Sequence, residues 1–437
     1  MDDRVQRIYQ AFSPTPLSAE QTDLYVRLDQ ARGGANVAER LGKRIRLAAP
    51  PTCQVLAGHR GSGKSTELAQ LCHDLGDPRS GEPRLFAVLC AADEDIDRND
   101  VDFPEILIAI IKQTAKQLKD RLGISLKPGY FKDLIERFKK VLTSDISLDE
   151  FELGKGLLKL SGAIRSSPDA RMAVRKLLEP DAGNWIYAAN DLLGQATLEL
   201  SKKGYAGLVV IVDDLDKMVL RPHDAGCSTQ EYLFVHRAAQ LSSFACHMIY
   251  TMPLELAYSH QEQTIAKLYG GRVPVVPMTQ VATRPPKSRP YKTGMKLFQQ
   301  IIAKRLASAA AVEQDLFDTP KVRDELIRLS GGQPTELMSL VRESIVSGSL
   351  PINEQLLKRA RQEGRRAYAR QLRIDHWPIL KKAKASGQLT RTKDNDQAVR
   401  ELLESRAILL YVNDQEWYGV NPLAADIKPP PTTRRKR

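Results

Sequence analysis

The chain alternates short apolar runs with longer stretches of helical periodicity. The helical stretches place apolar residues at i, i+3 and i+4, as in FPEILIAIIKQTAKQL at 103–118. The apolar runs are QVLA (54–57), LFAVLC (85–90), LVVIV (208–212), HMIYT (247–251) and VPVV (273–276). Runs that are apolar throughout are typical of parallel strands buried on both faces, with helices as the connections. The pattern therefore predicts an α/β fold with a parallel sheet covered by helices on both sides.

This sheet domain is expected at 51–280, after a helical lead-in at 1–50. Residues from about 104 to 203 have helical periodicity and form an insertion between two strands. Within it, Gly, Ser and Pro at 144–169 predict a loop or a mobile hairpin. A helix is expected at about 229–244, ahead of the fourth strand.

A proline-containing linker at 281–291 separates the sheet domain from a helical lid domain at 292–373. Two further helices, near 379–386 and 396–405, precede strands at 408–412 and 417–420. Helices followed by such a hairpin predict a winged-helix domain at 374–427. The last residues, 428–437, are rich in Pro and Arg and predict a basic disordered tail.

The first strand runs into GHRGSGKS, which matches the pattern GxxxxGK[ST] of a phosphate-binding loop. Glycines let backbone N–H groups turn inward as an anion-binding nest, and the following helix adds its N-terminal dipole. In such loops the lysine reaches the β- and γ-phosphates and the hydroxyl lies on Mg²⁺. The predicted contacts with ATP come from the whole segment: Gly58, His59, Arg60, Gly61, Ser62, Gly63, Lys64, Ser65 and Thr66.

The third apolar strand ends in two acids, LVVIVDD, which is where a nucleotide site needs a carboxylate for Mg²⁺. Asp213 is the candidate metal ligand together with Ser65, and Asp214 is the candidate base that orients the attacking water. Core strands also end in Asp at ordinary turns, so the glycine loop is what favours the functional interpretation. Asp216 is expected to begin a helix rather than to bind metal.

Four motifs in this order resemble bacterial ATPases that combine AAA+-type and STAND-type features. They are GHRGSGKSTEL, VVIVDDLDK, HMIYTMP and LSGGQPTELMSLV, and the resemblance spans roughly residues 20–345. The Asp-Asp ending is similar to STAND and KAP-type ATPases. The resemblance implies the strand order 5-1-4-3-2, a P-loop ATPase activity, and Thr251 at the position that senses the γ-phosphate. It also implies that GGQP, ending in Pro334, opens a second sensor helix.

One position departs from the family pattern, because relatives often carry Arg directly after that proline and this chain has Thr335. A sensing arginine is then either missing or supplied elsewhere, for example by Arg342. Arg272 lies where a neighbouring subunit's arginine finger would be, although a solvated arginine at a strand entrance is the somewhat favoured alternative. Arg171 and Arg175 are further interface candidates. Tyr25 and Arg32 are candidates for contact with the adenine, by their position in similar ATPases.

The net charge of +12 raises the expectation of a polyanionic partner. The excess of basic residues is concentrated in the last fifth of the chain. Between Lys358 and Lys393 basic residues greatly outnumber acids. The helix expected to read DNA in a winged helix, however, carries Asp394, Asp396, Glu401 and Glu404. Packing of the winged helix against the nucleotide domain, as in STAND ATPases, is therefore favoured over groove reading.

Neither a signal peptide nor a membrane span is expected, and the five cysteines have no metal spacing, so we expect a cytoplasmic protein with reduced thiols. The leading hypothesis is an ATP- and Mg²⁺-dependent switch that forms homo-oligomers and acts on a separate effector protein, in anti-phage defence by resemblance. The alternative is a DNA-associated AAA+ ATPase, such as a loader or initiator, that uses its basic end. A nucleotide-binding scaffold with little turnover is the third possibility.

Overall fold

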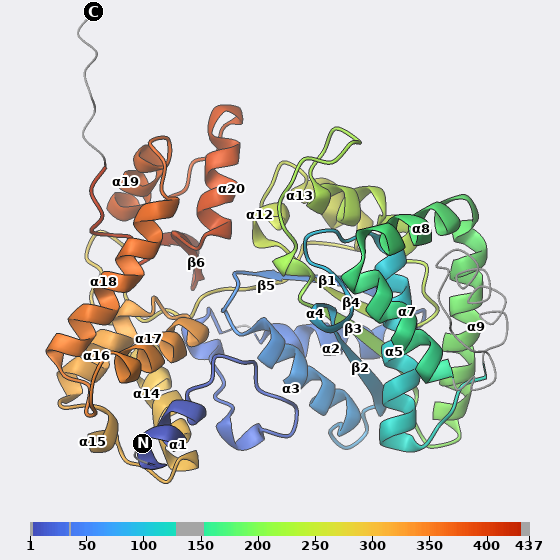
Figure 1. The fold of residues 1–437 in the computed structure, drawn as a ribbon, viewed down its shortest axis with the longest axis horizontal. Helices are drawn as coiled ribbons and strands as arrows, with labels where there is room; N and C mark the ends of the chain where they lie inside the picture. Colours follow the sequence, from blue (N-terminus) through green and yellow to red (C-terminus); the bar gives the residue numbers. More distant parts are fainter. Residues whose placement is uncertain (1–2, 35, 128–152, 430–437) are drawn as a thin grey trace, which may run out of the picture. The chain divides into compact units, whose positions relative to one another are not determined.

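The computed structural model describes residues 3–34, 36–127 and 153–429, shown as a ribbon in Figure 1. The chain divides into two compact units. The sheet unit comprises Val37–Ala57 and Glu67–Pro274, and the lid unit comprises Met1–Asn36, Gly58–Thr66 and Val275–Arg437. The phosphate-loop motif thus groups with the lid unit, whereas the acidic strand end lies in the sheet unit.

Five strands form one sheet, in the order β2-β3-β4-β1-β5. They are β1 (Cys53–Gly58), β2 (Leu85–Ala91), β3 (Gly207–Asp213), β4 (His247–Met252) and β5 (Val275–Val276). The pairs β1–β4, β2–β3 and β3–β4 are parallel. This order is the predicted 5-1-4-3-2 read from the other edge, so the predicted fold class is confirmed.

Strand β3 forms the centre of the core in the sheet unit. Residues 208–213 are all buried, and Val209 to Val212 are fully covered. Burying each such aliphatic side chain contributes about 1.5–3 kcal/mol, so this run of β-branched residues strongly favours a central strand. The same burial delivers Asp213 to the carboxyl end of the strand.

Helices of the sheet unit pack against its strands (Figure 1). Helix α5 (Phe103–Leu122) contacts β2 and β3, and α9 (Ala182–Ser201) contacts β3. Asp102 and Glu105 form a capping box at the start of α5, and Gly123 ends it in the left-handed conformation. The other long helices are α2 (Val37–Leu47), α3 (Lys64–Gly76), α7 (Leu153–Ser166) and α8 (Pro168–Leu178).

One local prediction in the sheet unit was wrong, and another missed an irregularity within a helix. Where a loop or hairpin was expected at 144–169, α7 and the start of α8 are found, and 144–152 lie outside the described residues. Leu160 and Ile164 are buried and α7 packs on α5, so tertiary burial overrides the weak helix propensity of its glycines. The single helix expected at 229–244 is broken into α10 (Thr229–Glu231), a π-helical turn (Tyr232–His236) and α11 (Ala238–Leu241).

Helices make up most of the lid unit. Helix α1 (Asp3–Ala11) contacts α14 (Lys292–Ser308) and α17 (Pro334–Val346). Helix α16 (Pro320–Leu329) contacts α14, α17 and α18 (Glu354–Gln371). The guanidinium of Arg342 on α17 lies 3.9 Å from the ring centroid of Tyr9 on α1. The lead-in is thus anchored on the lid helices.

The end of the lid unit contains two helices and a hairpin. Helices α19 (His376–Ser386) and α20 (Asp396–Glu404) precede β6 (Ile408–Val412) and β7 (Glu416–Val420), which pair antiparallel. Tyr411 and Trp417 face one another in the register and stack with ring centroids 4.2 Å apart. These elements agree with the predicted winged helix. None of the described helices combines the length and the apolar character that crossing a membrane requires.

Candidate nucleotide site

The phosphate-loop motif forms a tight turn between β1 and α3. Gly61 and Gly63 adopt φ angles of +79° and +97°, a conformation that is costly for residues with a side chain. The loop ends where Lys64 begins α3, so backbone amides at a helix N-terminus converge there. This local geometry suits an anion cradle, and the binding of phosphate by the loop stays a prediction.

Lys64 is held inside this loop. Its Nζ donates to the carbonyl oxygens of Gly58 at 2.7 Å and His59 at 2.8 Å, and the residue is only 5% exposed. A buried ammonium is costly unless it is hydrogen-bonded, and the loop carbonyls supply these bonds. The loop therefore concentrates positive charge at the point where its amides converge. Further along, Thr66 Oγ1 accepts a bond from the Leu17 amide at 3.3 Å.

Arg32 contacts the same loop. Its guanidinium donates to the Ser62 carbonyl and, through Nε, to Thr279 Oγ1 at 3.1 Å, and the residue is 5% exposed. The structure thus places Arg32 against the phosphate loop, and its expected contact with adenine stays a prediction. Tyr25 is half-buried, and its carbonyl accepts from Lys304 of α14 at 2.9 Å. Its stacking on a base likewise stays a prediction.

His59 joins the loop to the winged helix. Its Nε2 accepts a hydrogen bond from the Leu410 amide of β6 at 2.9 Å. Complete burial, together with the charge of Lys64, lowers its pKa from 6.5 to about 3, so the ring is neutral near pH 7. Next to it, Arg60 lies 3.9 Å from Glu404 of α20. His59 occupies a variable position of the phosphate-loop motif. The local sequence pattern therefore gives no sign of its long-range partner, Leu410.

The GGQP turn lies beside the loop within the lid unit. Tyr411 Oη donates to the Gly331 carbonyl at 2.7 Å, and Gly332 sits so close to Thr279 that an added Cβ would be 1.6 Å from its carbonyl oxygen. Pro334 opens α17, and Thr335 follows at a point 3.2 Å from where a Cβ on Gly61 would be. The sensor helix thus begins against the phosphate loop, with Thr335 facing Gly61.

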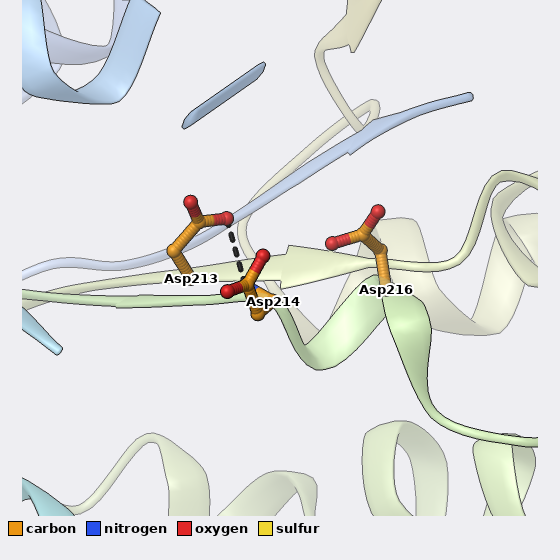
Figure 2. A group of neighbouring side chains, drawn as sticks. All are labelled: Asp213, Asp214 and Asp216. Atoms are coloured by element: carbon orange, nitrogen blue, oxygen red, sulfur yellow. Dashed lines mark hydrogen bonds between the residues drawn. The ribbon is translucent and has the colours of Figure 1, made fainter. Parts of the chain in front are cut away.

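In the sheet unit, three carboxylates gather at the end of β3 (Figure 2). Asp213, Asp214 and Asp216 each offer an oxygen, and these atoms lie within 4.8 Å of one another. Asp213 accepts the Asp214 amide at 2.7 Å, which the dashed line in Figure 2 marks. Asp216 lies in the first turn of a short 3₁₀-helix (Leu215–Lys217), in agreement with the predicted helix start, and it is 4% exposed. The cluster therefore includes one acid that the sequence set aside.

The second acid is electrostatically coupled to its surroundings. Burial and the neighbouring Asp213 raise the pKa of Asp214 to about 6, although Lys217 opposes this shift. Lys217 forms ion pairs with both Asp214 and Asp93. Thr251, at the end of β4, accepts the Leu215 amide on Oγ1 at 3.1 Å and so holds the turn after the acids in place. A role for Thr251 in sensing phosphate stays a prediction.

Mg²⁺ prefers oxygen ligands and binds through one or two carboxylates together with substrate phosphates. The Asp213 cluster offers such oxygens, with close carboxylates whose repulsion a divalent cation would relieve. The residues present therefore fit Mg²⁺. The hydroxyl of Ser65, the other predicted ligand, lies in the first turn of α3 and is half-buried.

Comparison with known proteins gives a distant likeness in fold. No family model matches the sequence, and the search of curated proteins finds no match either. Among solved structures, the Walker-type ATPase PABY2304 of Pyrococcus abyssi is 15% identical, with a TM-score of 0.42 over 95% of this chain and 98% of that one. The ORC2 protein of Aeropyrum pernix, in ADPNP and ADP complexes, is 12% identical, with a TM-score of 0.41 over 88% and 89%.

A third similar structure is the ORC1 protein of Aeropyrum pernix in complex with DNA. It is 14% identical, with a TM-score of 0.38 over 89% of this chain and 91% of that one. The chain thus aligns with each of these three structures over most of its length, at low sequence identity.

The arginines considered from the sequence have different surroundings. Arg272 is exposed and lies in the segment before β5, so its action on a neighbouring subunit stays a prediction. Arg342 stacks on the ring of Tyr9 within the lid unit, and its predicted role as a sensing arginine stays a prediction. Arg171 and Arg175 form ion pairs within the sheet unit, at 2.9 and 2.7 Å from Asp100. The last two therefore already have an internal structural function.

Proposed function

We propose that this protein binds and hydrolyses ATP and acts as a nucleotide-dependent switch. The observation that carries the proposal is the phosphate loop, in which left-handed glycines, a helix N-terminus and the buried Lys64 converge. Strands β1 and β3 both pair in parallel with β4. Their carboxyl ends therefore leave the same sheet edge, which is where ligands bind in open α/β sheets.

In this proposal Lys64 neutralises the terminal phosphates, while Ser65 and Asp213 hold Mg²⁺. The metal would supply charge neutralisation on the β- and γ-oxygens. Asp214 orients the attacking water. To do so, its carboxylate must leave the ion pair that it forms with Lys217. Thr251 keeps the acidic turn rigid, and Arg272 completes the site of a neighbouring copy. Gly58 to Thr66 and Pro334 line the triphosphate, with Tyr25 and Arg32 beside the nucleotide.

The switch is supported by bonds between the loop and the winged helix. His59 accepts from Leu410, and Arg60 faces Glu404, so two consecutive loop residues contact β6 and α20. A γ-phosphate that reshapes the loop must also change these contacts. The nucleotide state would thereby set the position of the winged helix, and oligomerisation or recruitment of a protein partner would follow.

Phosphate release from ATP tests the activity. We expect turnover by the wild type and at least a 100-fold loss in Lys64→Ala and Asp214→Asn, because the first removes charge from the phosphates and the second removes the base. Lys202→Ala, an exposed lysine at the end of α9, is the matched control and should retain full activity. Absence of turnover in the wild type, or equal rates in all variants, would contradict the proposal.

A DNA-associated role is the second candidate. It has more support than a role in anti-phage defence, which no observation supports. Exposed lysines on and near α19, namely Lys381, Lys382 and Lys393, pair with no carboxylate in the described chain. Helix α20 is less suitable, since Arg400 there is buried beside Asp396. DNA would therefore meet α19 rather than α20. Stimulation of ATPase activity by duplex DNA, with affinity falling steeply as salt rises, would support this role.

A further inference from the structure

The guanidinium of Arg406 lies next to the phosphate loop. Its Nη1 is 3.8 Å from the position that a Cβ on Gly61 would occupy. The Cβ of Thr335, which stands where an arginine was expected, lies 3.2 Å from the same position. Two segments of the lid unit that are far apart in the sequence, α17 and the turn after α20, therefore reach one point of the loop.

This arginine is available for a ligand. Throughout the described chain, no hydrogen bond or ion pair engages its guanidinium. Its positive charge nevertheless acts on the loop, since it opposes protonation of His59, and it also stabilises the charged form of Glu336. A guanidinium that makes no ion pair beside an anion cradle is well placed to bind a phosphate.

The backbone of Arg406 is fixed in an unusual conformation. Its φ is +61°, a left-handed value that a non-glycine residue adopts only when its surroundings enforce it. Here the Arg406 carbonyl accepts from Asn421 Nδ2 at 3.1 Å and from Tyr368 Oη of α18 at 3.5 Å. The strained turn is thus anchored between the winged helix and the lid, and it directs the side chain toward the loop.

We propose that Arg406 contacts the terminal phosphates of a bound triphosphate and thereby links the winged helix to the nucleotide state. This inference rests on the proposed ATP-binding function and assigns the sensing arginine that α17 lacks. Because Arg406 belongs to the turn between α20 and β6, any displacement of the winged helix moves the guanidinium away from Gly61. Loss of the γ-phosphate would conversely release this turn.

Paired titrations of ATP and ADP with Mg²⁺ present, read by calorimetry, test the assignment. For Arg406→Ala we expect affinity for ATP to fall at least 10-fold while affinity for ADP changes less than 2-fold, with Arg406→Lys intermediate. Arg370→Ala, an exposed arginine on α18, should match the wild type for both nucleotides. Thermal melting of each variant shows whether it is folded.

Equal losses for ATP and ADP in a folded Arg406→Ala protein would overturn the assignment, because they indicate a structural role. The assignment would also be overturned if the ratio of ATP affinity to ADP affinity were unchanged in both Arg406→Ala and Arg406→Lys. In either case a wild type that binds ATP leaves the proposed function intact. A wild type that binds neither nucleotide would instead refute the proposed function itself.

Discussion

The bond between His59 and Leu410 makes the attachment of the winged helix sensitive to acid. In the folded chain the ring is neutral, with a pKa lowered to about 3 by burial, whereas in the unfolded chain it titrates near 6.5. Between these values the unfolded state binds a proton and the folded state does not. Stability is therefore lost as the pH falls below 6.5 and is fully present above it.

The size of the effect follows from this difference. Each pH unit below 6.5 costs about 1.4 kcal/mol, so the loss at pH 5 is about 2 kcal/mol. A proton on Nε2 would also abolish the acceptor for the Leu410 amide, which is buried with it. The first region to respond should be the contact between the loop and β6.

Hydrogen exchange at the Leu410 amide, followed from pH 7.5 to 5 and corrected for intrinsic rates, measures this directly. The wild type should lose protection toward pH 5 by about 30-fold, which corresponds to about 2 kcal/mol. His59→Gln keeps an acceptor but does not titrate, so its protection should be independent of pH. Protection that falls equally in both proteins would refute the reasoning, since another group would then be responsible.

Three further outcomes are expected. Arg32→Ala should lower the melting temperature of the lid unit and its free energy of unfolding by about 2 kcal/mol, because it leaves the Ser62 carbonyl and Thr279 without their buried partner. Arg27→Ala, at an exposed site, should not. Gly332→Ala should lower the free energy of unfolding by about 3 kcal/mol or more, measured with denaturant, because the new Cβ would meet the Thr279 carbonyl. Gly34 is also left-handed but lies in open space, so Gly34→Ala should lower it by about 1 kcal/mol. Equal losses in the two variants would exclude the clash as the cause. Arg175→Ala should destabilise the sheet unit by about 3 kcal/mol because it leaves the fully buried Glu105 unpaired, and adding Glu105→Gln should restore part of this loss in a thermal melt.

Much of the fold could be predicted from the sequence because its strongest signals are local. Each central strand is an uninterrupted apolar run, and burial on both faces demands that pattern. The hairpin of the winged helix was also predicted, although its second strand alternates buried residues with more exposed ones. By contrast, α7 is built on a segment with several glycines, and only its packing on α5 makes it helical.

For the site, the sequence could predict residue types but not their long-range partners. The loop and the acidic strand end are contiguous motifs whose chemistry is readable from spacing. His59 and Arg406 belong to the site only through contacts spanning hundreds of residues, such as the bond to Leu410. Asp216 joins its neighbours because a 3₁₀ turn follows β3 directly. The amino-acid sequence alone does not distinguish such a turn from the start of an α-helix.

The central claim is that the loop at Gly58 to Thr66 cradles a triphosphate with a metal held by Asp213. Calorimetric titration of ATP into the full chain, with Mg²⁺ and then with EDTA, tests it most directly. We expect one saturable site per chain, lost in Lys64→Ala, and weakened by Asp213→Asn only when Mg²⁺ is present. Absence of binding by the wild type, or equal affinity in Lys64→Ala, would contradict the claim.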